Sequence, residues 1–201
     1  MRTCSGRSPA TTARASSTAA TGPAPAEAAA GIAAGAAHAD GHAAQHDGLG
    51  PLAGRTFFFF LNMAIGVALG SLMQPEDVLV PYYRDTGLQL LRGVRMEEIL
   101  LYWGGDERGS AYADPAVAED FPLCVPIATQ ALHACGVASA FKIRGQHRVA
   151  VTTCGDGATS KGDFLEALNV AGAWQLPVVF VVNNNQWAIS VPRRIQCGAP
   201  T

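Results

Sequence analysis

Two short polar clusters in the sequence have residue types that could bind a metal ion and a phosphate: GDG at 155–157 and NNN at 183–185. Magnesium favours oxygen ligands and usually binds few protein carboxylates together with phosphate oxygens. Asp156 could supply the charge, one asparagine of the second cluster a neutral oxygen, and a backbone carbonyl just after that cluster a third ligand. The pattern therefore predicts a magnesium–phosphate site.

Small residues around the acid would let the backbone come close to a phosphate. Gly155 and Gly157 flank it, and residues 158–161 open a predicted helix whose free N–H groups attract anions. Each cluster alone is weak support, because Asp-Gly is a common turn and an asparagine run commonly ends a strand. Their occurrence at the two ends of one helix–strand unit makes the combined pattern specific.

The elements that must position these clusters form a regular pattern from residue 77 onward. Continuous apolar and β-branched runs predict buried parallel strands, and longer mixed segments predict helices. Strands are expected at 78–83, 148–154 and 177–182, and helices at 87–102, 126–141 and 161–174. We therefore predict an α/β fold, a parallel sheet with helices on both faces. Ligands bind beyond the carboxyl ends of such strands, so both clusters should emerge on the same rim.

Residues 1–54 differ from the rest of the chain in composition. They are rich in Ala, Gly, Ser, Thr, Pro and His and contain almost no large apolar residues, so we predict a disordered segment followed by a folded domain over 55–201. The arginines among Ser and Thr at 2–18 resemble an organellar transit peptide but lack an amphipathic stripe. His38, His42 and His46 share a helical spacing that could bind a metal, although low-complexity sequence is the favoured interpretation.

Residues 56–73 form an uncharged run that just reaches the length of a membrane span. Because a strand pattern follows directly, we favour a buried helix of an α/β domain over a membrane anchor.

The overall composition excludes some classes of protein. The 201 residues carry a net charge of -2, which gives no electrostatic case for binding nucleic acid or an anionic membrane. The five cysteines are odd in number and include no CxxC pair, which indicates a reducing compartment. A cytoplasmic location is expected, with the mitochondrial matrix as the alternative.

The stretch GDGATSKGDFLEALNVAGAWQLPVVFVVNNNQWAIS resembles the thiamine diphosphate signature, which opens with GDG and closes with NN. More narrowly, VPYYRDTG, VPIATQALHACGVA and NNNQWAISVP resemble the alpha subunits of 2-oxo acid dehydrogenases, in particular that of the pyruvate dehydrogenase component. The similarity covers about residues 64–201. It implies the thiamine diphosphate-binding fold for this part of the chain.

The resemblance assigns roles to individual residues. It implies that Asp156 and Asn185 bind magnesium together with the main-chain carbonyl of Trp187, and that Gly157 and Ala158 lie against the diphosphate.

Two further segments receive roles from the same resemblance. Tyr83 and Arg84 match a Tyr-Arg pair that reaches the phosphate end of the cofactor, a task that suits the planar fork of arginine. Val125 and Ile127 match the segment that meets the aminopyrimidine ring, although ordinary packing at a helix start is an alternative for Ile127.

The function implied by the resemblance is thiamine diphosphate- and magnesium-dependent oxidative decarboxylation of pyruvate, with transfer of the acyl group to a lipoyl group. The implied partners are a beta subunit in a heterotetramer, with the cofactor between the subunits, and the lipoyl-bearing dihydrolipoyl acyltransferase. Branched-chain 2-oxo acid and acetoin dehydrogenase alpha subunits share the motifs, so the choice of 2-oxo acid stays open. An inactive gene fragment is the remaining alternative.

The sequence departs from the family at both ends. A GQEA motif is replaced by LNMA at 61–64 and nothing upstream matches, which favours a frameshifted or misjoined segment over an authentic divergent N-terminus. The chain stops at Thr201, before the family's loop with a histidine that acts on the cofactor adduct. We therefore expect a fragment, incomplete at its C-terminus and inactive alone, in which no catalytic residue can be named.

Overall fold

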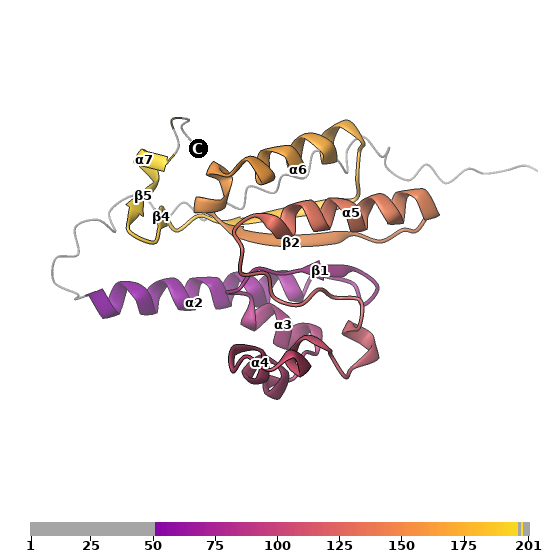
Figure 1. The fold of residues 1–201 in the computed structure, drawn as a ribbon, viewed down its shortest axis with the longest axis horizontal. Helices are drawn as coiled ribbons and strands as arrows, with labels where there is room; N and C mark the ends of the chain where they lie inside the picture. Colours follow the sequence, from indigo (N-terminus) through magenta and orange to yellow (C-terminus); the bar gives the residue numbers. More distant parts are fainter. Residues whose placement is uncertain (1–50, 197, 199–201) are drawn as a thin grey trace, which may run out of the picture.

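The computed structural model describes residues 51–196 and 198, which form an α/β arrangement (Figure 1). Its elements are α2 Pro51–Gly70, β1 Val78–Val80, α3 Thr86–Arg92, α4 Met96–Trp103, η2 Glu107–Ser110, η3 Pro115–Val117, α5 Thr129–Arg144, β2 Ala150–Gly155, η4 Asp156–Ser160, α6 Gly162–Ala173, β3 Val178–Asn183, β4 Trp187–Ala188, β5 Val191–Pro192 and α7 Arg193–Gln196. The predictions for residues 1–50, including disorder and the histidine tract, lie outside the described residues. Residues 51–54, also predicted to be disordered, instead form the first turn of α2.

The central sheet is parallel, with the strand order β1-β2-β3. Ala150 of β2 pairs with Val78 on one side and Val178 on the other. β2 lies between its two neighbours and is almost fully buried, which explains its unbroken apolar and β-branched sequence. All three predicted strands are present, but β1 ends at Val80 rather than at residue 83, because the chain turns at Tyr82–Asp85.

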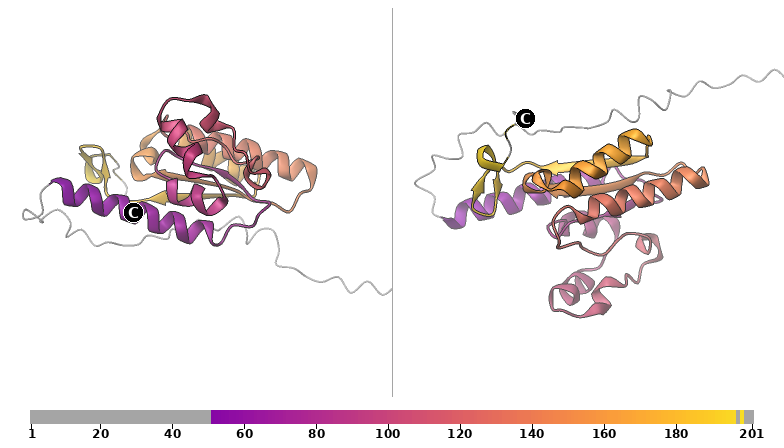
Figure 2. Two further views of the ribbon diagram at one scale, coloured as in Figure 1. Left: turned by 90° about the horizontal axis from the view of Figure 1, so that it is seen from below. Right: turned by 45° about the horizontal axis from the view of Figure 1, so that its top comes forward.

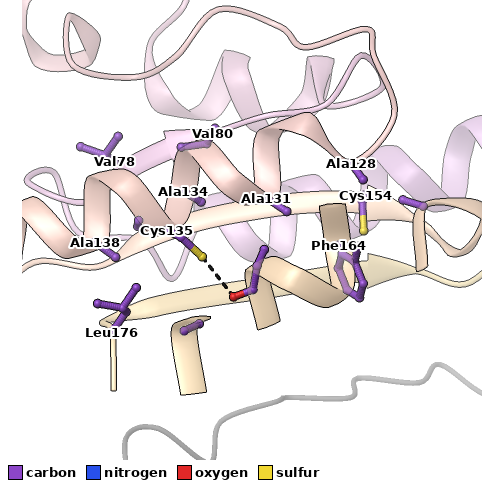
Figure 3. Close-up of a cluster of buried hydrophobic side chains, with 14 of the residues drawn as sticks. Val78, Val80, Ala128, Ala131, Ala134, Cys135, Ala138, Cys154, Phe164 and Leu176 are labelled. Atoms are coloured by element: carbon purple, nitrogen blue, oxygen red, sulfur yellow. Dashed lines mark hydrogen bonds between the residues drawn. The ribbon is translucent and has the colours of Figure 1, made fainter. Parts of the chain in front are cut away.

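One face of the sheet is covered by α5 and α6, which lie together over the strands in Figure 2 (right). Alternate strand residues point into this core, among them Val78, Val80 and Ala150. Small residues on α5 let it pack closely, and the thiol of Cys135 donates to the carbonyl oxygen of Ala167 on α6 over 3.3 Å (Figure 3). This cluster is the main hydrophobic core.

The opposite face is covered by α2 and α3, which pack against each other. Thr153 points away from the α5 core and donates its hydroxyl to Asp85 at the start of α3. Asn183 of β3 donates its amide N–H to Asn62 of α2 over 3.0 Å. The predicted parallel sheet with helices on both faces is therefore confirmed.

The helix predicted over 87–102 is wrong in one respect, because the chain forms two helices there. α3 ends at Gly93, whose φ of 110° is left-handed, and Val94 N–H bonds the carbonyl of Gln89 in a helix-ending turn. α4 then restarts with the backbone N–H of Arg95 donating to the Glu98 carboxylate over 2.9 Å. The apolar pattern continues across this break, so periodicity alone could not detect it.

Two other helix predictions also need correction. α5 starts at Thr129 rather than Pro126, because Ala128 takes a left-handed φ of 66° and the segment before it runs past the site described below. α2 spans Pro51–Gly70 and is not fully buried as predicted for 56–73: Asn62 is buried, but Val67 is exposed. Within the described part of the chain, no helix combines the length and apolar character needed to cross a membrane.

Candidate functional site

A pocket lies at the carboxyl ends of the strands, with about 640 Å³ of empty space that includes its open mouth. Gly155 at the end of β2 pairs with Asn183 at the end of β3, so the two polar clusters share one rim as predicted. The nine residues predicted for the site all line this pocket: Tyr83, Arg84, Val125, Ile127, Asp156, Gly157, Ala158, Asn185 and Trp187. The structure thus brings together four segments that lie far apart in the sequence.

Asp156 is the acidic residue of the pocket, at the point where β2 passes into η4. Its side chain is only 5% exposed, and neither carboxylate oxygen has a hydrogen-bond partner among the described residues. Burial raises the pKa of Asp156; nearby backbone N–H groups, which do not meet hydrogen-bond geometry with either oxygen, and the charge of Arg193 offset this only in part. A buried, unpartnered carboxylate is costly, so its persistence in a pocket indicates a cationic ligand.

Gly157 is where the chain approaches its neighbour most closely at this rim. A Cβ on Gly157 would lie 2.6 Å from the Cβ of Ala188 in β4, a distance that side chains do not tolerate. The absence of a side chain therefore lets the β4–β5 hairpin close over the start of η4. This hairpin extends beyond the end of β3 (left in Figure 1).

The three asparagines at 183–185 occupy different environments. Asn183 is buried on the α2 side of the sheet, and Asn184 accepts hydrogen bonds from the backbone and side chain of Gln186. Of the three, Asn185 lines the pocket. Its side-chain oxygen accepts the N–H of Trp187 over 2.9 Å, which fixes the side chain and leaves the second lone pair of that oxygen for a ligand.

Trp187 begins the β4–β5 hairpin that forms one wall of the pocket. The turn of this hairpin contains Ile189, which is 98% exposed and has a left-handed φ of 56°. Such a conformation is uncommon for a β-branched residue and indicates a constrained turn. The hairpin therefore presents apolar side chains at the edge of the pocket.

Tyr83 and Arg84 lie on a tight turn after β1 and also line the pocket. The guanidinium of Arg84 lies 5.1 Å from the centre of the Tyr83 ring, in a cation–π contact. Arg84 is exposed and Tyr83 half-buried, so the charged group is open to solvent at the pocket wall. This places a cation where a phosphate could reach it.

Val125 and Ile127 belong to the irregular segment before α5, and both are about half exposed. The Lys161 ammonium donates to the carbonyl of Ile127 over 2.9 Å and to the carboxylate of Asp163 over 2.6 Å. Lys161 therefore ties this segment to the start of α6.

Several lining residues were not predicted from sequence, namely Tyr82, Cys124, Pro126, Ala128, Gln130, Cys154, Ala188 and Ile189, whereas Gly155 was expected beside the acid. Cys154 is buried, with its pKa raised to about 12 by burial, so it is a packing residue and no nucleophile at neutral pH. Gln130 is almost fully buried, and its amide N–H donates to the carbonyl of Thr153 over 2.9 Å. Neither the spacing of Gln130 nor its place early in a predicted helix could have indicated this bond.

The donors around the rim have the chemistry of a hard-cation site. One carboxylate, one amide oxygen and a main-chain carbonyl, from Asp156, Asn185 and Trp187, are all oxygens, as magnesium requires. One carboxylate leaves positive charge on the ion, which phosphate oxygens could neutralise, and Arg84 lies in the wall of the same pocket. The arrangement fits a metal–diphosphate ligand.

Comparison with known proteins agrees with the family resemblance of the sequence motifs. The model of the dehydrogenase E1 component family matches residues 56–201, which begins before the residue 64 indicated by the motifs. The pyruvate dehydrogenase E1 component subunit alpha of Acholeplasma laidlawii is 41% identical over 144 residues, which cover 70% of this chain and 41% of that protein. The corresponding subunit of Mycoplasma genitalium is 37% identical over 147 residues, covering 72% and 40%.

A relative with a different named substrate is equally similar. The 3-methyl-2-oxobutanoate dehydrogenase subunit alpha of Mycobacterium tuberculosis is 41% identical over 138 residues, 69% of this chain and 37% of that protein. The chain thus spans about two fifths of the length of these relatives.

Proposed function

Because the chain belongs to the dehydrogenase E1 component family, we propose that it is an alpha subunit of a 2-oxo acid dehydrogenase whose pocket binds magnesium and thiamine diphosphate. The observation that carries this proposal is the buried carboxylate of Asp156, which lies in the pocket without a hydrogen-bond partner among the described residues. A metal ion would supply the missing partner.

In this proposal Asp156, the side-chain oxygen of Asn185 and the carbonyl of Trp187 hold the ion. Arg84 and Tyr83 contact the phosphate end of the cofactor, and Val125 and Ile127 contact its ring end. Thiamine diphosphate supplies a nucleophilic carbon and an electron sink for the decarboxylation of a 2-oxo acid. The chain itself anchors and orients the cofactor, and its apolar hairpin and 124–128 segment limit the access of water.

The preferred substrate is pyruvate, with transfer of the acyl group to a lipoyl group. The relatives from Acholeplasma laidlawii and Mycoplasma genitalium, which are named for pyruvate, support this choice. A branched-chain 2-oxo acid is the second candidate, supported by the relative named for 3-methyl-2-oxobutanoate. Comparing the two substrates in the assembled enzyme distinguishes them: the higher kcat/KM identifies the substrate.

The proposed partners are a beta subunit and a lipoyl-bearing dihydrolipoyl acyltransferase. The names of the relatives describe an alpha subunit, which supports the existence of a second subunit. A cytoplasmic location is proposed with them, supported by the bacterial relatives and by the free state of Cys124, Cys135 and Cys154.

Calorimetric titration tests the proposal. Thiamine diphosphate is titrated into the chain, alone and in complex with its partner subunit, with and without magnesium. Saturable binding that requires magnesium is expected. If neither preparation binds the cofactor in the presence of magnesium, the proposal fails.

The same titration tests the role of Arg84. Arg84→Ala is expected to weaken binding about tenfold, because a charge-assisted phosphate contact is worth about 1.5–3 kcal/mol and solvent at an exposed side chain reduces it toward the lower value. Arg144→Ala is the matched control, since Arg144 lies at the far end of α5 from the pocket. Equal affinities for the Arg84 and Arg144 variants would remove Arg84 from the site.

A further inference from the structure

The turn that carries Tyr83 and Arg84 is held by two hydrogen bonds between Tyr82 and Asp85. The backbone N–H of Asp85 donates to the carbonyl of Tyr82 over 3.1 Å, and the Asp85 carboxylate accepts the N–H of Tyr82 over 3.0 Å. Tyr83 and Arg84 are the two central residues of this turn. Their position therefore depends on Asp85.

Asp85 stands at the N-cap of α3, where an aspartate usually accepts a hydrogen bond from the first turn of the helix. Here the side chain makes no such bond. It turns back to the Tyr82 N–H and to the hydroxyl of Thr153 in the middle of β2. The carboxylate is thus used to hold the turn and not to cap the helix.

Burying the carboxyl group of Asp85 also costs free energy of folding. The residue is only 3% exposed, it forms no ion pair with another described residue, and burial raises the pKa of its carboxyl to about 7. The hydrogen bonds from Thr153 and Tyr82 oppose that shift only in part. Retaining an acid in such a place is consistent with a positional requirement that a neutral packing residue would not meet.

The hydrogen bond from Thr153 to Asp85 connects two parts of the pocket wall. Thr153, which donates to Asp85, lies in β2 three residues before Asp156, which begins η4 directly after that strand. The carbonyl of Thr153 in turn accepts the amide N–H of Gln130, a lining residue on α5. A continuous series of hydrogen bonds therefore joins α5, β2 and the turn that carries Tyr83 and Arg84.

We propose that Asp85 is a positioning residue for anion binding: through Tyr82 and Thr153, it holds Tyr83 and Arg84 toward the diphosphate end of the ligand. This rests on the proposed function, since it assumes that Arg84 contacts a diphosphate. Asp85 itself is not among the residues that line the pocket.

The experiment measures binding of inorganic pyrophosphate with magnesium by calorimetry, using the full chain with its partner subunit. Asp85→Ala is expected to weaken binding about tenfold, and Thr153→Val, which removes only the anchoring hydroxyl, several-fold. Thr153→Ser keeps the hydroxyl that Thr153→Val removes and should bind within about twofold of the wild type. If Asp85→Ala does not fold, as judged by circular dichroism, the two Thr153 variants carry the test.

A double-mutant cycle with Arg84→Ala separates positioning from general destabilisation. If Asp85 acts through the turn, Thr153→Val and Asp85→Ala should have almost no further effect once Arg84 is removed. Effects that multiply fully in the Arg84→Ala background, or wild-type affinity in Thr153→Val, would overturn the inference. A wild type that binds no pyrophosphate would instead contradict the proposed function.

Discussion

Asp156→Ala is expected to weaken the binding of thiamine diphosphate with magnesium at least about 100-fold, the largest loss expected of any single variant in this chain. Changes in residues that only support a metal ligand cost about 10–100-fold, so loss of the charged ligand itself should reach or exceed that range. Magnesium accepts few substitutes for a carboxylate. Calorimetric titration measures the loss, and Glu166→Ala, an exposed acid on α6, is the matched control.

A substitution at Asp156 that weakens binding should nevertheless increase the thermal stability of the ligand-free chain. Both Asp156 oxygens are buried without partners and burial raises the carboxyl pKa, so the ionised form is unfavourable in the empty pocket. Asp156→Asn should therefore raise the melting temperature of the ligand-free chain while binding is lost. A lower melting temperature would indicate that Asp156 is a structural residue.

Gly157→Ala is expected to be the second most damaging change. The new Cβ would lie 2.6 Å from Ala188, so the β4–β5 hairpin must move, together with Trp187 at its start. Forcing an extra carbon into a packed contact costs about 1–3 kcal/mol of stability. The displaced hairpin should add a loss of cofactor binding approaching a hundredfold.

Chemical denaturation and calorimetric titration measure the two effects of Gly157→Ala. Gly172→Ala is the control for stability, because a Cβ there meets nothing within 4 Å and the residue is helical. That control should be neutral or slightly stabilising. A Gly157→Ala variant that binds and unfolds like the wild type would show that no close approach of the hairpin is needed.

The fold could be predicted to a large extent because its strands have the sequence pattern of buried parallel strands, although β3 is only partly buried here. β2 and β3 have continuous apolar, β-branched sequences, and such runs separated by helices admit few arrangements. The common rim of the two polar clusters followed from that arrangement alone. Element ends were less predictable, since the break at Gly93 and the late start of α5 depend on backbone conformations that periodicity does not encode.

The candidate site could be predicted only partly from residue types. The NNN cluster offered three asparagines of equal chemistry, and the resemblance was needed to choose Asn185. The structure gives a physical reason for their difference: strand alternation directs Asn183 to the α2 side, and the following turn brings Asn185 to the pocket.

Asp85 illustrates what sequence could not reveal about the site. An aspartate before a helix reads as a cap, and only the three-dimensional contacts with Tyr82 and Thr153 show that its carboxylate holds a turn. Those contacts join residues up to 68 positions apart. No local pattern contains that information.

The central claim is that Asp156, Asn185 and Trp187 hold one metal ion that also binds a diphosphate. A crystal structure of the chain with its partner subunit, manganese and thiamine diphosphate tests this most directly, because manganese shares the oxygen ligands of magnesium and scatters anomalously. The prediction is one anomalous peak that contacts all three residues, with diphosphate density extending from it toward Arg84. A cofactor whose metal peak lies away from Asp156 and Asn185 would contradict the claim.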